Sequence, residues 1–339
     1  MVRYIISIPF LGLCMRRREF IALLGGAAAS PLTAHAQQST MPVVGFLHSG
    51  VESQSSHVIG FSKGLAEVGF VEDRDVRVHY RFAEGRYDQL PAMVVELASV
   101  PVAVLAATGG VQTALAAKSN GGPIPVVFGN GSDPVQFGLV ASLNRPGGHI
   151  TGVSFFTATL EAKRLGLLSK LVPDARVFGV LVNPTNENVE NQLKDVAQGG
   201  ITLGRPLIIL KASTEAEIEK AFGGFVQQGA DALLVASDPY FFGRRQTILA
   251  LAAQYSLPAI YEWSQFAQEG GLASYGTNLF DNYRLVGLYV GRILKGERPA
   301  DLPVVQATKF EFVVNLKAAK SLSITLPAGP VSTADEVIE

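Results

Sequence analysis

The sequence predicts an α/β protein made of two Rossmann-like lobes, each built on a parallel sheet. Three observations carry this prediction. Short apolar strands alternate with amphipathic helices, the alternation restarts after a turn-rich break near residue 150, and the segment 272–302 predicts a return to the first lobe. A chain of 339 residues, 48% hydrophobic and 17% charged, is long enough for two packed cores.

The first 36 residues have the composition of an export signal. Three arginines at 16–18 precede an uncharged run rich in Ala, Gly and Leu, and residues 34–36 form a small-x-small pattern that a signal peptidase cuts. Paired arginines before x-Phe-Ile resemble the bacterial twin-arginine signal, although Arg16 replaces the usual Ser or Thr. We expect translation to begin at Met15 and the mature periplasmic protein to begin after Ala36; the alternative is one N-terminal anchor.

Removal of this signal changes the charge and removes the only cysteine. The whole chain has 28 basic and 29 acidic residues; cleavage after Ala36 removes four arginines and one glutamate, which leaves 24 and 28, a net charge of −4. A nucleic acid partner is therefore not expected, since phosphate binding needs a clustered excess of Lys and Arg. Loss of Cys14 excludes a disulfide, a cysteine nucleophile and a thiolate metal site.

Strand and helix patterns alternate in both predicted lobes. In the first lobe we expect strands at 43–48, 75–81, 102–106 and 124–128, and helices around 61–68, at 87–97, at 111–118 and from 134 to 143. The strand 150–155 is expected to cross into the second lobe, which has strands at 177–182, 207–210, 231–236, 257–261 and 271–275 and helices at 160–171, 187–198, 214–228 and 241–255. Repeated βα units predict right-handed crossovers.

The return segment 272–302 predicts a strand, a polar turn and then a helix. Its apolar positions are Leu285, Leu288, Tyr289, Ile293 and Leu294. Gly296 and Pro299 predict where the helix ends. A return to the first lobe would leave one polar cleft between two lobes.

Small polar residues stand where the predicted strands end. Ligands of open parallel sheets bind at the carboxyl ends of the strands, where loops converge. The candidate ligand-binding residues are Ser49, Gly50, Thr108, Gly109, Asp133, Phe155, Asn183, Asn186, Asp238, Tyr261, Glu262 and Tyr275. Each polar one alone is typical of an N-cap or turn. Their presence in both lobes, beside aromatic residues, favours a site for a small amphipathic ligand.

Signatures of enzymes and cofactor sites are missing from the sequence. It has no Gly-x-Gly-x-x-Gly after the first strand, no phosphate loop and no Gly-x-Ser-x-Gly elbow. The histidines at 48, 57, 79 and 149 lack metal-ligand spacing. We therefore expect no catalytic residue, no cofactor and no metal.

Several stretches together resemble a known family. They are Gly64–Phe70, Asp133–Val135, Ser142–Gly148, Ala162–Leu165, Leu181–Pro184, Arg292–Gly296 and Lys309–Leu316, followed by Ala318 and Lys320. The chain from about Pro42 to Glu339 resembles the substrate-binding proteins of ABC transporters, in the family related to the tryptophan and tyrosine uptake receptors, which have the type I periplasmic-binding-protein fold.

The resemblance implies three hinge crossovers, near Gly152, Gly276 and Val305. The lobes would then be 42–152 with 276–305, and 153–275 with 306–335. It also implies a monomer that captures a small molecule, such as an aromatic or other amino acid, and delivers it to a membrane permease with its ATPase subunit. If the ligand is an amino acid, we expect Asp238 or Asp133 to hold the amino group, Thr108 and Ser49 the carboxylate, and Tyr261 the apolar part.

Two alternatives remain at this point. A periplasmic ligand-sensing subunit of a signalling system would have the same fold and cleft. An exported small-molecule enzyme could use Asp238 and Glu262 as acid and base. The sequence leaves the ligand unnamed.

Overall fold

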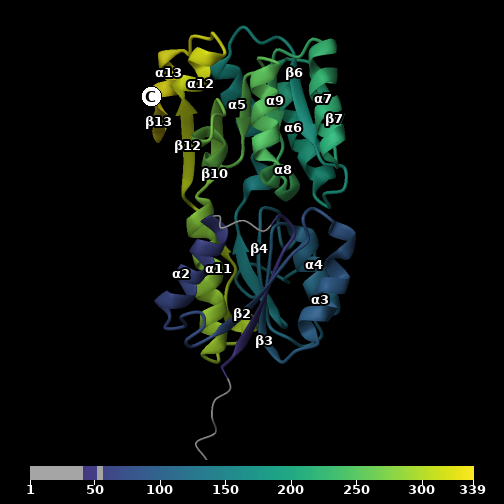
Figure 1. Cartoon of the computed structure of the whole chain (residues 1–339), viewed down its shortest axis with the longest axis vertical. Helices are drawn as coiled ribbons and strands as arrows, with labels where there is room; N and C mark the ends of the chain where they lie inside the picture. The colour runs from purple at the N-terminus through teal and green to yellow at the C-terminus, as the bar shows by residue number, and fades with distance from the viewer. Residues whose placement is uncertain (1–40, 52–55) are drawn as a thin grey trace, which may run out of the picture. The chain divides into compact units, whose positions relative to one another are not determined.

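The computed structural model describes residues 41–51 and 56–339, which form two lobes, each around its own sheet (Figure 1). This confirms the predicted α/β class with two lobes. The expected export signal, 1–36, lies outside the described residues.

The sheet of the first lobe has six parallel strands in the order β11-β5-β4-β3-β1-β2. Its strands are β1 (Val43–His48), β2 (Arg77–Phe82), β3 (Val102–Thr108), β4 (Val126–Asn130), β5 (Ile150–Ser154) and β11 (Val305–Gln306). Its helices are α2 (Ser56–Glu67), α3 (Leu90–Ala98), α4 (Val111–Asn120) and α11 (Leu279–Leu294), with short 3-10 turns η1 (Tyr87–Gln89) and η3 (Pro299–Asp301). All five residues of β4 are buried, as expected of a parallel strand covered on both faces.

Two helices far apart in the sequence, α2 and α11, lie side by side on one side of this sheet, and α3 and α4 lie on the other (Figure 1). Glycines allow the close approach of α2 and α11. A Cβ at Gly64 would lie 1.9 Å from the carbonyl oxygen of Arg284, and one at Gly287 would lie 2.0 Å from that of Phe61. The return segment therefore completes the first lobe.

The sheet of the second lobe has seven strands in the order β13-β12-β10-β9-β8-β6-β7, parallel except for the antiparallel pair β10 and β12. Its strands are β6 (Phe178–Val182), β7 (Leu207–Lys211), β8 (Ala232–Val235), β9 (Ala259–Tyr261), β10 (Ala273–Thr277), β12 (Phe310–Asn315) and β13 (Glu336–Ile338). Its helices are α5 (Glu161–Leu171), α6 (Val189–Leu203), α7 (Glu215–Gln227), α8 (Pro239–Gly243), α9 (Arg245–Gln254), α10 (Ser264–Gln268), α12 (Leu316–Ser321) and α13 (Ala328–Ser332), with η2 (Thr157–Thr159) before α5.

The chain passes between the two sheets three times. It leaves the first sheet after Ser154, returns after Thr277 and leaves again after Gln306. The strand expected to cross into the second lobe, 150–155, is β5 of the first sheet, paired with β4 and β11.

Two predicted helices differ from the structure. Residues 134–143 form turns instead of a helix, because Gly138 has φ +63° and the Asp133 carboxylate accepts from the N–H groups of Val135 and Gln136, which closes a turn. The helix expected at 241–255 is divided at Arg244 into α8 and α9.

The buried face of α11 only partly matches the predicted one. Of the five predicted apolar positions, Tyr289 and Ile293 are buried, whereas Leu285, Leu288 and Leu294 are only partly buried. The unpredicted Tyr283, Val286 and Val290 are buried as well. The helix contacts both α2 and the sheet, so its buried face is wider than one stripe of leucines. None of the helices within 41–51 and 56–339 combines the length and the apolar character needed to cross a membrane.

Candidate functional site

A cavity lies where the carboxyl ends of strands from both lobes meet. The last residue of β1 and the residues at the ends of β3, β4 and β5 line it from the first lobe, and residues in the loops after β6, β8 and β9 line it from the second. Its empty volume is about 580 Å³, including the part that opens to solvent.

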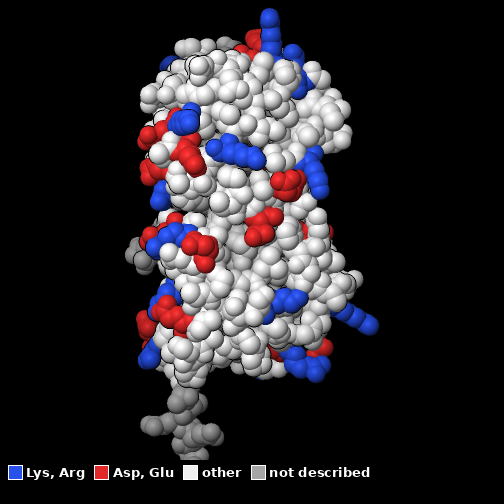
Figure 2. All heavy atoms as spheres, turned by 90° about the vertical axis from the view of Figure 1, so that its right-hand side faces the viewer, with Lys and Arg blue, Asp and Glu red and all other residues white. Residues whose placement is uncertain are grey.

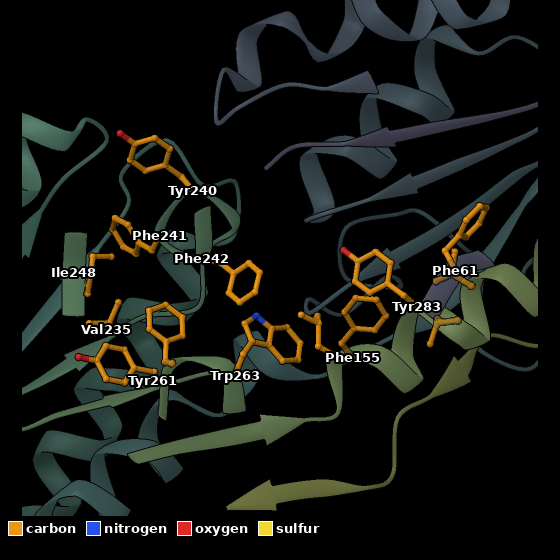
Figure 3. Packing of buried hydrophobic residues seen from close by; sticks show 14 of the residues in the cluster. Phe61, Phe155, Val235, Tyr240, Phe241, Phe242, Ile248, Tyr261, Trp263 and Tyr283 are labelled. Atoms are coloured by element: carbon orange, nitrogen blue, oxygen red, sulfur yellow. The ribbon is translucent and has the colours of Figure 1, made fainter. Parts of the chain in front are cut away.

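Four aromatic side chains form one wall of the cavity: Phe155 after β5, Phe242 in α8, Trp263 after β9 and Tyr283 in α11. Figure 3 shows Phe242 and Trp263 on one side and Phe155 and Tyr283 beside them on the other. The ring of Phe155 lies 6.4 Å from that of Trp263, edge to face at 74°, and 5.6 Å from that of Tyr283. We call this group the aromatic wall; it offers flat apolar surface from both lobes.

Two histidines adjoin this wall. His48, the last residue of β1, stacks on His57 in α2 with the ring centroids 4.6 Å apart. The Gly50 N–H donates to His48 Nδ1 at 2.7 Å, so in the neutral ring Nε2 carries the proton and donates to the Tyr283 hydroxyl at 3.0 Å. Burial lowers the pKa of His48 well below its usual value and that of His57 to about 4. Both rings are therefore uncharged near neutral pH.

Glu262 is a carboxylate at the cavity. It directly follows β9, is 5% exposed and accepts a hydrogen bond from the Ser237 hydroxyl. Burial raises the pKa of Glu262 to about 7, although the charge of Arg164 acts in the opposite direction. No lysine or arginine belongs to the described residues that line the cavity. The cavity therefore suits a ligand with a positive group near Glu262.

A buried ion pair holds the backbone near the Glu262 end of the cavity. Arg164 and Glu161, both fully buried on α5, are joined at 2.9 Å. Arg164 also donates to the backbone carbonyls of Thr157 at 2.9 Å and Tyr275 at 2.7 Å, and Glu161 accepts from the Ser237 N–H at 2.9 Å. Burial raises the pKa of Glu161 despite the Arg164 charge. The pair thus connects the first two crossovers with the loop that carries Ser237.

Asp238 is buried but does not line the cavity. It caps α8 through two backbone N–H groups and also accepts from Asn183 at 3.1 Å, Asn186 at 2.7 Å and the Tyr87 hydroxyl at 3.2 Å. Five donors fill the roughly four lone-pair positions of a carboxylate. Burial raises the pKa of Asp238 against the lowering effect of the two asparagines. The carboxylate therefore has no capacity left for a ligand amino group.

Ser49 and Thr108 also lie beneath the cavity rather than on its surface. Both are fully buried, and their hydroxyls donate to backbone carbonyls, Ser49 to Gly109 and Thr108 to Leu47 at 3.3 Å. Gly109 lines the cavity at φ +82°, where a Cβ would lie 2.7 Å from the Ser49 hydroxyl oxygen. These residues shape the loop before α4.

Three further candidates lie apart from the cavity. Asp133 is exposed and closes its own turn. Tyr261 is buried in the second lobe, where it stacks on Phe266 with the centroids 4.5 Å apart, and Tyr275 stacks on Phe310 at 6.0 Å. Of the sequence candidates, the cavity is lined by Gly109, Phe155, Asn186 and Glu262.

Other lining residues were missed by sequence reasoning. The largest are Trp263, Phe242 and Tyr283, and Asn130, Asn188 and Ser237 add polar atoms. Ser237 and Trp263 each lie two residues after the end of a strand, a signal that could have found them. Within 41–51 and 56–339 no group of three or more His, Cys, Asp or Glu side chains is placed to hold a metal ion.

Residues 46–338 match the family described as ABC transporter substrate binding protein. The chain belongs to this family. The sequence motifs had indicated this family, and the match confirms that prediction. The two-lobed arrangement is that of the type I periplasmic binding proteins. Proteins of this family bind a solute outside the cytoplasm for an ABC transporter and do not convert it, so the prediction that the chain is not an enzyme is also confirmed.

Individual relatives are distant. A tyrosine-binding protein of Clostridioides difficile (strain R20291) is 24% identical over 269 residues, 78% of this chain and 76% of that protein. Two solved structures, a conserved domain protein from Vibrio cholerae and an ABC domain in complex with L-Trp from Streptococcus pneumoniae, match with TM-scores of 0.80 and 0.79. Each is 24% identical, and each match covers 88% of this chain and 100% of the other. At this identity they show the fold.

Proposed function

We propose that this substrate-binding protein captures an amino acid with an aromatic side chain and delivers it to a membrane permease and its ATPase subunit. One observation carries the proposal: the aromatic wall and the buried carboxylate of Glu262 border the same cavity, which residues of both lobes line. The names of two relatives, one tyrosine-binding and one solved with L-Trp, support the same ligand class.

Each part of the ligand has a matching surface. The aromatic wall packs on the side chain, and offset or edge-on contacts between rings add stability beyond the burial of area. Glu262 holds the ammonium group, since the carboxylates of Asp238 and Asp133 are engaged by other donors. The ammonium also favours the ionised form of Glu262, which burial alone disfavours.

Capture depends on contact with both lobes. A ligand that touches Phe155 on the first lobe and Trp263 on the second favours the arrangement in which the lobes approach each other, because only that arrangement provides both contacts. We propose that the lobes hinge where the chain passes between the sheets, after Ser154, Thr277 and Gln306, within two residues of the expected Gly152, Gly276 and Val305. We also propose that the mature monomer begins after Ala36 in the periplasm.

Calorimetric titration of the protein beginning at Gln37 tests the proposal. The panel is L-tyrosine, L-tryptophan, L-phenylalanine, L-leucine and D-glucose. We expect saturable binding of an aromatic amino acid without turnover, and weak or no binding of glucose. A ligand at one hundred times its Kd should add about 2.7 kcal/mol to the free energy of unfolding. Glu262→Gln should weaken binding about tenfold, as expected for loss of a charged hydrogen bond. Binding of glucose in preference to every amino acid would overturn the proposal.

A further inference from the structure

Two buried side-chain amides border the cavity with a free N–H group each. Asn130 is the last residue of β4 in the first lobe, and Asn188 precedes α6 in the second. They are 1% and 3% exposed, and both line the cavity. Neither Nδ2 atom has a hydrogen-bond partner within the part of the chain that the structure describes. Buried N–H groups are costly to leave unpaired, so an acceptor atom is favoured beside each of them.

The orientation of the Asn130 amide follows from its neighbour. Its Oδ1 accepts from the backbone N–H of Ser132 at 2.8 Å. A backbone N–H can only donate, so the oxygen must face the loop, and Nδ2 is left on the other side of the amide. The free group of Asn130 is therefore a donor.

Asn188 is held by a chain of amides that reaches the other lobe. Its Oδ1 accepts from Asn191 Nδ2 at 2.9 Å, and Asn191 Oδ1 accepts from Gln136 Nε2, in the first lobe, at 3.1 Å. With this orientation the free atom of Asn188 is also the donor Nδ2. An acceptor atom bound beside Asn188 Nδ2 would favour this orientation of all three side-chain amides.

Two helix N-termini add to the attraction for an anion. α4, of 10 residues, begins after Gly110, and α6, of 15 residues, begins after Asn188; neither has a side-chain cap. Gly109, Gly110 and Val111 at the start of α4 line the cavity. Both helix starts present the partial positive charge of the helix dipole. At α6 the backbone N–H groups of Val189, Asn191 and Gln192 already donate to the carbonyls of Asn186 and Asn188, so this start contributes through its dipole. No lysine or arginine lines the described part of the cavity, so the helix dipoles and the side-chain amides are the groups that can attract an anion there.

We propose that Asn130 and Asn188, with the N-termini of α4 and α6, bind the carboxylate of the ligand. This inference rests on the proposed function and assigns residues from both lobes to one ligand group. Glu262 on the same cavity selects for a positive group, so the cavity as a whole selects a zwitterion. An amine that lacks the carboxylate leaves both amides unpaired, and a carboxylic acid that lacks the ammonium is repelled by Glu262.

The test compares ligands with and without a carboxylate. L-tryptophan and L-tyrosine are titrated beside tryptamine and tyramine into the wild type, Asn130→Asp and Asn188→Asp. Aspartate keeps the oxygen that accepts from Ser132 or Asn191 but replaces the N–H donor with negative charge. Asn144→Asp, on an exposed loop of the first lobe, is the matched control for added charge.

We expect each cavity variant to bind the two amino acids about tenfold more weakly or worse and the two amines as tightly as the wild type or more tightly. The control should change no affinity by more than about twofold. Equal loss for amino acids and amines, or no loss for either, would overturn the inference. Thermal unfolding of each variant shows whether it is folded.

Acetate provides an independent arm. In ¹⁵N-labelled protein, the side-chain amide resonances of Asn130 and Asn188 are assigned by their disappearance in the aspartate variants. Acetate should shift both in a saturable way at a pH below the pKa of Glu262. If neither amino acid binds the wild type, the proposed ligand class fails, while a saturable acetate shift still supports the carboxylate site. Absence of an acetate shift in that case overturns the site as well.

Discussion

The Tyr87 hydroxyl of the first lobe donates a hydrogen bond to the Asp238 carboxylate of the second, with 3.2 Å between Oη and Oδ2. Burial and the charge of Asp238 raise the pKa of Tyr87 well above its usual value, so the phenol stays a donor. Asp238 in turn caps α8, which carries Phe242 of the aromatic wall. This bond therefore joins the first lobe to the loop that positions part of the cavity.

Replacing Tyr87 with Phe removes the hydroxyl and keeps the ring. We expect the affinity for an aromatic amino acid to fall about fivefold, because the arrangement with the lobes close together loses one hydrogen bond worth about 1 kcal/mol. Calorimetry with the tightest-binding amino acid of the panel measures this loss. Tyr255→Phe makes the same chemical change at the end of α9, away from the cavity, and should leave affinity unchanged. Equal affinities of the two variants would show that the bond does not favour the approach of the lobes.

Glu262→Gln should change how stability depends on pH. The carboxyl has an ordinary pKa near 4.5 and a pKa of about 7 in the folded protein, so wild-type stability decreases as pH rises from about 4.5 to 7 and then stays low. Above pH 7 the unliganded variant should be more stable than the wild type by on the order of 3 kcal/mol. Urea unfolding of both proteins between about pH 4 and pH 8 measures the difference. A difference that does not vary with pH would contradict a raised pKa.

Arg164→Met should destabilise the second lobe. Glu161 would remain buried without its cation, and the carbonyls of Thr157 and Tyr275 would lose their donor. Breaking a buried ion pair costs about 3–5 kcal/mol. Arg298→Met is the control: its pair with Asp301 has side chains that are 76% and 59% exposed, and its loss should cost less than about 1 kcal/mol. Urea unfolding would contradict this account if the two variants lost similar amounts.

Gly287→Ala should show how tightly α2 and α11 pack. The added Cβ would lie 2.0 Å from the Phe61 carbonyl oxygen, a backbone atom that can move only with its helix. We expect a loss of about 3 kcal/mol in the free energy of unfolding. In Gly166→Ala, within α5, the new Cβ meets nothing within 4 Å, so this control should gain about 0.5–1 kcal/mol from helix propensity. The same sign for both variants would contradict the close approach.

The sequence predicted the fold well because strand and helix periodicity is local. The helix expected up to 143 failed because backbone geometry at Gly138 and the Asp133 turn overrode its apolar spacing. The nearly equal numbers of basic and acidic residues also predicted a surface without a large excess of either charge. Figure 2 accordingly shows Lys and Arg mixed with Asp and Glu on the face that it presents.

The site was only partly predictable. Glu262 and Asp133 both follow predicted strands, yet one lines the cavity and the other is exposed, because a polar residue at a strand end can serve a ligand or its own turn. Tyr283 reaches the cavity from a helix 235 residues after His48, its hydrogen-bond partner. Such a distant pairing depends on tertiary packing, which a single sequence does not display.

The fluorescence of Trp263 tests the central claim most directly. It is the only tryptophan in the chain and belongs to the aromatic wall, so its emission reports on the cavity itself. In a titration with L-tyrosine, excited where tyrosine absorbs little, we expect a saturable change of emission with the same Kd as calorimetry. Saturable binding by calorimetry without any change in Trp263 emission would place the ligand elsewhere and contradict this account.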